Sequence, residues 1–163
     1  AIVTVEKNAT FKTDFELLRG KAGIININYE TTCYEGSLLE MNAKVNGIDD
    51  DDITIRETGH LKGQGAVGVL TTRIAVRDNA KATVYNTLTA HAAFARGHVD
   101  CKEIIQDNGV AKAIPIVEVY HPKAHVTHEA AIGSVDDKQL QTLMARGLDE
   151  DEAVDLIIQG LLS

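Results

Sequence analysis

A turn motif that recurs at a fixed interval is the feature that most constrains how this chain folds. Residues 77–82 (RDNAKA) are echoed 29 residues later by residues 106–111 (QDNGVA), and residues 6–10 (EKNAT) are a looser third copy. Each copy places an asparagine at a tight turn before a new strand. Repetition at a constant spacing indicates a fold built from similar structural units.

The segments between these turns resemble short β-strands. Runs rich in Val, Ile, Leu and Thr are separated by turn residues such as Asn46-Gly47 and Asp78-Asn79. In residues 53–56 (ITIR) the apolar side chains fall at every second position, which is the period of a strand. The predicted strands are residues 23–29, 37–45, 53–56, 67–76, 82–88, 99–105, 114–120 and 125–128.

The interior of this mainly β fold must be filled without large rings. Aromatic residues make up 4% of the 163 residues and tryptophan is absent, whereas 44% of the chain is hydrophobic. In a solenoid each coil buries its inner face against its neighbours, so ladders of aliphatic side chains replace large aromatics. A β-sandwich is also built from many short strands. The strand pattern alone therefore leaves a sandwich and a solenoid open.

Composition excludes several classes of function. The formal net charge of −8 argues against nucleic acid as a partner, because a phosphate-binding surface needs clustered Lys and Arg. No apolar run approaches the length of about 20 residues that spans a membrane, and no signal peptide opens the chain. Cys33 and Cys101 match no zinc spacing, so free thiols in a reducing cytosol are the simplest interpretation. Because Ala1 is not a methionine, we expect a processed chain or part of a longer one.

The hydrophobic period changes from that of a strand to that of a helix near residue 134. Leu140, Leu143 and Met144 follow the i, i+3, i+4 spacing of one helical face. Ser134 followed by Asp137 resembles a capping box at the start of this helix. We therefore divide the chain into a β core, residues 1–134, and a helical segment, residues 135–163.

A second helix is predicted at the C-terminus, and its apolar surface is unusually wide. Asp149 fits the N-cap position and Glu152 the reciprocal third position of a capping box. The apolar residues that follow cover more than one face of the helix, so two apolar neighbours are needed to bury them. A binding partner, a homodimer and simple burial against the same chain all satisfy this need. The apolar positions are Ala153, Val154, Leu156, Ile157, Ile158, Leu161 and Leu162.

The residues His128 and Glu129 are candidate ligands for iron or zinc, and Cys101 could join them from a neighbouring strand. Alternation within a strand places His128 and Glu129 on opposite faces unless the strand ends there. Ordinary polar residues near a strand end are the competing interpretation. The acidic run at residues 49–52 lacks the alternating ligands of a calcium loop, which favours a solvated turn. No nucleophile with a neighbouring base is found, so we predict a protein without a catalytic site.

Two C-terminal segments resemble the SufB/SufD family, the scaffold subunits of the SUF iron–sulfur cluster assembly system. They are residues 126–133 (VTHEAAIG) and residues 139–153 (QLQTLMARGLDEDEA). Three upstream segments are similar to the same family in the same order: residues 72–80 (TRIAVRDNA), 95–101 (ARGHVDC) and 113–118 (AIPIVE). The resemblance covers most of the chain and is most specific at its C-terminal end.

This resemblance implies a right-handed parallel β-helix and a non-catalytic scaffold. It implies that residues 136–162 dock a SufC-like ABC ATPase, and that a second SufB/SufD-like subunit binds through the β-helix as a homodimer or heterodimer. It also implies that His128 lies at the subunit junction where a nascent iron–sulfur cluster is held, with Glu129 following it and Cys101 as the one thiol in the C-terminal half.

The chain departs from the SufB-like pattern in two places. Thr127 stands where these chains often have glutamate, and Gly109 and Val110 lie near the place of a cluster-related cysteine. A structural SufD-like subunit that binds the ATPase without holding a cluster is therefore the alternative. A carbohydrate-active enzyme on a β-helix is more remote, because the chain shows no export signal, few aromatics and no paired carboxylates.

Overall fold

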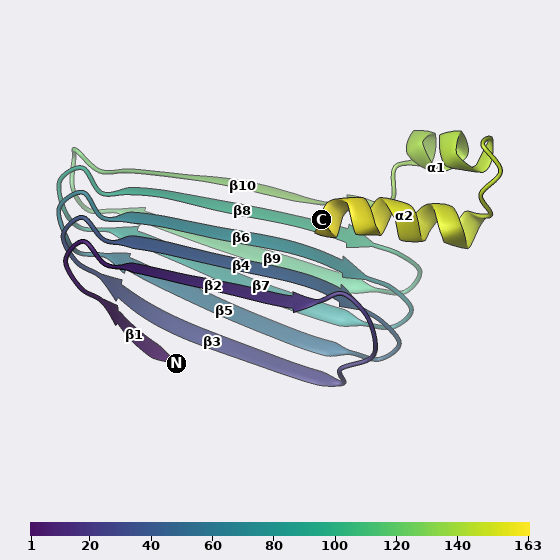
Figure 1. The fold of residues 1–163 in the computed structure, drawn as a ribbon, viewed down its shortest axis with the longest axis horizontal. Helices are drawn as coiled ribbons and strands as arrows, with labels where there is room; N and C mark the ends of the chain where they lie inside the picture. The colour runs from purple at the N-terminus through teal and green to yellow at the C-terminus, as the bar shows by residue number, and fades with distance from the viewer.

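The computed structural model describes residues 1–163 as a stack of β-coils with a helical hairpin beside the C-terminal ends of the strands of one sheet (Figure 1). Ten strands form two parallel sheets, ordered β1-β3-β5-β7-β9 and β10-β8-β6-β4-β2. Strands that follow one another in sequence belong to different sheets, so each coil contributes one strand to each sheet. The predicted parallel β-helix is thereby confirmed and the β-sandwich is excluded.

The bounds of the strands are β1 (Ile2–Val5), β2 (Thr10–Leu17), β3 (Ile24–Cys33), β4 (Leu38–Gly47), β5 (Asp52–Leu61), β6 (Val67–Val76), β7 (Lys81–Ala90), β8 (Arg96–Ile105), β9 (Val110–Val119) and β10 (His125–Ser134). The first two strands were not among the predicted runs. The last one extends six residues beyond the predicted end at residue 128.

The coil length explains the repeat in the sequence. Ile53 on β5 pairs with Ala82 on β7, and Ala82 pairs in turn with Ala111 on β9, so equivalent positions are 29 residues apart. The two turn motifs 77–82 and 106–111 therefore lie directly above one another in the stack. The repeat that indicated similar structural units corresponds to one full coil.

Aspartates stabilise the stacked turns. Asp49, Asp78 and Asp107 adopt positive φ angles of 53°, 55° and 55°, a conformation that Asn and Asp tolerate better than most residues. The Asp78 carboxylate accepts a 2.9 Å hydrogen bond from the backbone N–H of Asp49 in the neighbouring coil. Within the acidic run, Asp51 is buried and accepts from the backbone N–H groups of Ala22 and Gly23. Asp49 and Asp50 form the exposed turn that was predicted, whereas the prediction of a solvated run is wrong for Asp51, which is buried, and Asp52 begins β5.

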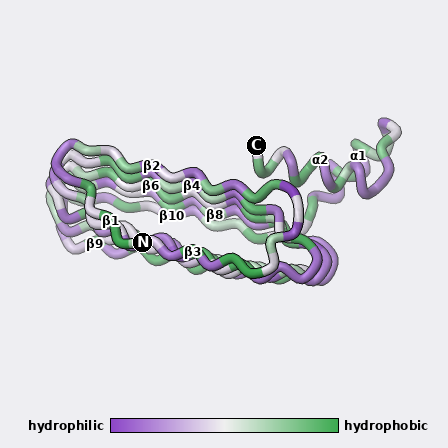
Figure 2. The backbone as a smooth tube through the Cα atoms, turned by 60° about the horizontal axis from the view of Figure 1, so that its bottom comes forward, coloured by the Kyte–Doolittle hydropathy of each residue, from purple (hydrophilic) through white to green (hydrophobic).

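Aliphatic side chains fill the interior between the two sheets, which face each other in Figure 2. Two buried clusters share this space, and both are dominated by Val, Ile, Leu and Ala. The largest fully buried side chains include Leu39, Met41, Ile55, Leu70 and Leu88. Ladders of aliphatic residues from successive coils thus take the place of aromatic rings.

The helices are α1 (Asp137–Met144) and α2 (Glu150–Leu162). The predicted cap of α1 at Ser134 is wrong, because Ser134 ends β10 and the Asp136 carboxylate instead accepts a 2.8 Å bond from the N–H of Gln139. The capping box of Asp149 and Glu152 at the start of α2 is confirmed.

One face of α2 packs on the β-helix. Val154, Ile158 and Leu162 are buried against Ala75 of β6 and Val135. An ion pair of 2.7 Å between Arg77 and Asp155 adds a polar contact between the helix and the coils. By contrast, α1 buries no residue completely and contacts mainly α2, so the hairpin projects from the stack (Figures 1 and 2).

Candidate functional site

The last coil of the β-helix has an open end, formed by β9 and β10. Each of these strands pairs with a neighbouring strand on one side only. Inner positions that are sealed in the coils below are accessible here, and Ile132 is 47% exposed. A solenoid that ends in this way presents apolar side chains and unpaired backbone groups, which need a cap or a partner.

His128 lies on the inner face of this open end. It pairs in register with Val99 of β8, which is completely buried, and aligned residues of parallel strands point to the same face. His128 itself is exposed because no coil covers it. Its imidazole is therefore accessible to a ligand or a partner at the end of the stack.

Glu129 lies on the opposite, outer face of β10. It aligns with Asp100, whose carboxylate forms an ion pair with Arg73 on the outer face of the sheet. Since β10 continues to Ser134, the strand does not end between His128 and Glu129. The two side chains therefore do not converge within this chain.

Cys101 is completely buried one coil below the open end. It aligns with Ala130 on the inner face, two positions along the strand from His128. Burial, reinforced by the negative charges of Glu103 and Asp100, raises the pKa of its thiol to about 12. Because a thiolate is the form that binds metal, Cys101 is not a ready ligand in this conformation.

Across the whole chain, no three His, Cys, Asp or Glu side chains gather into a group that could hold a metal ion. The three predicted ligands are thus distributed over the inner face, the outer face and the interior. Only His128 is both exposed and directed toward the open end.

A buried polar layer inside the β-helix was missed by the sequence analysis. Asn86 donates from Nδ2 to the Glu57 carboxylate and to the Thr72 hydroxyl, each at 3.1 Å. These three side chains connect β5, β7 and β6 across the interior. The available signal was Asn86 itself, which shares a strand face with Ala82, Val84 and Leu88 in an otherwise apolar ladder.

Two buried carboxyl groups, Glu57 of this layer and Glu103 of β8, release their protons only near neutral pH. Burial raises the pKa of Glu57 to about 7, although the hydrogen bond from Asn86 opposes the shift. Burial also raises the pKa of Glu103 to about 7, and Arg73 opposes that shift. Neither carboxylate oxygen of Glu103 has a hydrogen-bond partner, although the residue is only 3% exposed.

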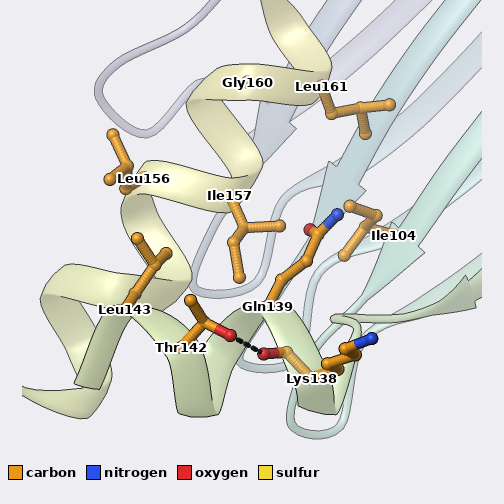
Figure 3. A pocket seen from close by; sticks show the side chains of 9 residues that line it. All are labelled: Ile104, Lys138, Gln139, Thr142, Leu143, Leu156, Ile157, Gly160 and Leu161. Atoms are coloured by element: carbon orange, nitrogen blue, oxygen red, sulfur yellow. Dashed lines mark hydrogen bonds between the residues drawn. The ribbon is translucent and has the colours of Figure 1, made fainter. Parts of the chain in front are cut away.

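An apolar cleft of about 680 Å³ opens between the helical hairpin and the C-terminal end of β8 (Figure 3). Leu143 of α1 and Leu156 and Ile157 of α2 line it, with Ile104 of β8 at its base. Leu156 is 47% exposed, so the face of α2 that turns away from the coils is not covered by this chain. The remaining lining residues are Lys138, Gln139, Thr142, Gly160 and Leu161.

The chain belongs to the SufBD family, whose members are iron–sulfur cluster assembly proteins. The model of the SUF system FeS cluster assembly SufBD core domain matches residues 2–161. An iron–sulfur cluster assembly SufBD family protein of Methanocaldococcus jannaschii is 37% identical over 98% of this chain and 51% of its own length. One from Pyrococcus horikoshii is 36% identical over 98% of this chain and 49% of its own length.

The chain thus spans about half the length of these relatives, with 51% and 49% covered. Neither α1 nor α2 is long and apolar enough to cross a membrane.

Proposed function

We propose that this chain is a non-catalytic scaffold subunit of SUF-type iron–sulfur cluster assembly that docks a SufC-like ABC ATPase through residues 136–162. ATP hydrolysis belongs to the partner, and the cluster is cargo of the assembled complex. Membership of the SufBD family supports the assembly role. The apolar cleft of the hairpin is the observation that carries the docking role, because it leaves Leu156 and Leu143 without a complete apolar environment.

The hairpin has the properties of a docking element. A contiguous exposed apolar surface next to polar residues is typical of a protein interaction site, and here Leu156 and Met144 are 47% and 41% exposed. Since α1 contacts mainly α2, a partner could move α1 without breaking the contacts of α2 with the β-helix. We propose that this is how ATP-driven changes in the partner reach the scaffold.

The second subunit is proposed to bind at the open end of the β-helix. The free edges of β9 and β10 offer unpaired backbone groups, and Val119 and Ile132 offer exposed apolar surface. A second SufB/SufD-like chain that caps the stack would pair these backbone groups and cover this apolar surface. His128 would then lie at the junction, with Glu129 and Cys101 as further ligands only if association rearranges the terminal coil. Two unpaired buried cysteines are consistent with the reducing cytosol that we propose as its location.

Replacing Leu156 with aspartate is expected to weaken co-purification with the cognate ATPase by about tenfold or more, because a charge replaces an apolar contact at the centre of the interface. Tyr34→Asp is the matched control, since Tyr34 is a similarly exposed ring on a turn outside the hairpin. Circular dichroism would verify that both variants fold. Equal retention of the ATPase by Leu156→Asp and wild type would contradict docking through the hairpin.

A cluster-free SufD-like subunit is the second candidate, and the burial of Cys101 is the observation that favours it. Anaerobic reconstitution with iron and sulfide, followed by visible absorbance, distinguishes the two. For the cluster-holding scaffold we expect absorbance from the wild-type protein and its loss in His128→Ala. The absence of a cluster in wild type would favour the SufD-like function, whereas equal uptake by both proteins would exclude His128 as a ligand.

A further inference from the structure

A second group of histidines lies far along the chain from His128, on the other sheet. His60 is near the end of β5, Thr89 is near the end of β7, and His91 follows one residue after β7. His60 and Thr89 pair in register, so neighbouring coils bring them together. His60 is partly exposed and His91 is exposed, whereas Thr89 is only 4% exposed. The group is therefore anchored by a buried hydroxyl and open to solvent on its imidazole side.

The hydroxyl of Thr89 contacts both imidazoles. Its Oγ1 atom lies 2.9 Å from Nδ1 of His60 and 3.0 Å from Nε2 of His91. One ring nitrogen can donate a hydrogen bond to this oxygen while the other accepts one from it. In the metal-free protein the hydroxyl and both imidazoles therefore have hydrogen-bond partners. Adjacent ligands of a tetrahedral Zn²⁺ ion with bond lengths of about 2.05 Å lie about 3.3 Å apart. Each ring nitrogen would therefore move away from the Thr89 hydroxyl by about 0.3–0.4 Å to share a metal ion with it.

Both rings are oriented by neighbours that do not block this position. Nε2 of His60, which points away from Thr89, is 3.7 Å from the carboxylate of Glu30. A carboxylate that accepts a hydrogen bond from the distal nitrogen of a histidine is common around metal ligands. At 3.7 Å Glu30 lies just beyond hydrogen-bonding distance, where it supplies negative charge near the His60 ring. His91 stacks on Tyr120, with ring centroids 4.6 Å apart and an angle of 10° between the planes.

We propose that His60 and His91, with the hydroxyl of Thr89 as a weaker third donor, form a site for a borderline divalent cation of the Zn²⁺ and Fe²⁺ class. Neutral imidazole suits these ions, and Glu30 provides compensating negative charge. With two nitrogen ligands and a hydroxyl, the site leaves coordination positions for water or for a further ligand. It suits reversible binding of an ion at the outer surface rather than a structural metal centre. The site does not depend on the proposed scaffold role or on His128.

Calorimetric titration with Zn²⁺ at pH 7.5 tests this site in the full chain. We expect one saturable binding step that is lost in both His60→Asn and His91→Asn. It should persist in His125→Asn, which removes an exposed histidine on the other sheet. Glu30→Gln should weaken this step by about tenfold, as is usual for loss of a carboxylate behind a ligating histidine.

Imidazole ¹⁵N resonances identify the ligands independently of the binding heat. Zn²⁺ should shift Nδ1 of His60 and Nε2 of His91, the two nitrogens that face Thr89. Two results would overturn the proposal: a Zn²⁺ step that survives both substitutions, or shifts confined to the other histidines. The absence of any saturable binding by wild type would overturn it as well.

Discussion

Replacing Glu57 with glutamine is expected to stabilise the protein at pH 8 by roughly 2–3 kcal/mol more than it does at pH 5. The buried Glu57 carboxyl has its pKa raised from 4.5 to about 7 in the folded protein. Each unit of difference between folded and unfolded pKa corresponds to about 1.4 kcal/mol. The wild-type protein therefore loses on the order of 3 kcal/mol when Glu57 ionises inside the β-helix, and a neutral amide avoids this loss.

The sign of this pH dependence follows from whether the folded or the unfolded chain binds the proton of Glu57 more tightly. Below pH 4.5, Glu57 is protonated in both the folded and the unfolded chain, and its full stabilising contribution is present. As the pH rises from 4.5 through about 7, the unfolded chain releases its proton first, so the free energy of unfolding decreases. Above that range both states are ionised and the loss is complete. Glu103, whose pKa is also raised to about 7, should act in the same direction.

Urea unfolding at pH 5 and pH 8 measures this effect, with the difference between the two pH values as the quantity of interest. Glu103→Gln should reproduce much of the effect of Glu57→Gln, and the double variant should remove most of the pH dependence. Glu6→Gln, which replaces an exposed glutamate in a turn, should change the stability by less than about 0.5 kcal/mol at either pH. If Glu57→Gln changed the stability equally at both pH values, the carboxyl would not be buried in its neutral form.

Those features of the fold that depend on repetition and composition could be predicted from the sequence. The 29-residue echo of the turn motif and the scarcity of aromatics indicated stacked units filled by aliphatic ladders. The choice between sandwich and solenoid was not accessible from the pattern, because alternation of apolar and polar residues does not report which strand a given strand pairs with. The resemblance to SufB/SufD proteins supplied that choice.

The missed strand β2 shows where the pattern method fails. Charged residues at positions 12, 14 and 16 alternate with Phe11, Thr13, Phe15 and Leu17 and give this strand a low average hydrophobicity. In the structure the three charged residues lie on the outer face, where Lys12 pairs with Glu40 and Asp14 accepts from Asn42 of the next coil. Contacts between neighbouring coils therefore stabilise this strand, although its own sequence carries only a weak hydrophobic signal.

The candidate site was predictable only where it depends on local alternation. His128 and Glu129 were expected on opposite faces if the strand continued, and β10 does continue to Ser134. The exposure of His128 depends instead on its position in the last coil, which no local pattern reports. Similarly, the burial of Glu103 and Cys101 follows from the pairing of β8 with β6 and β10.

The thiol of Cys101 is expected to react with a disulfide reagent at least about a thousandfold more slowly in the native protein than in the unfolded chain. Its pKa is raised from 9.0 to about 12, which alone lowers the fraction of reactive thiolate by about that factor below pH 9. Complete burial adds a barrier to access. The Cys33→Ser variant isolates this thiol, and absorbance of the released reagent measures its rate.

Cys101→Ser provides the matched control, since it leaves only Cys33. That thiol is equally buried in a coil remote from the open end, and its pKa is raised to about 11. A rate for Cys101 close to that of the unfolded chain would show that the interior of the β-helix is not closed around this thiol.

The same measurement in the assembled complex distinguishes the two candidate functions. If the scaffold uses Cys101 as a cluster ligand, the terminal coil must open, because a buried protonated thiol cannot bind iron. Adding the second subunit, the ATPase and ATP should then accelerate labelling of Cys101 but not of Cys33. If neither rate changes while the complex forms, Cys101 remains a core residue throughout the cycle. His128 and residues from the partner must then hold the cluster, or this subunit must serve without one.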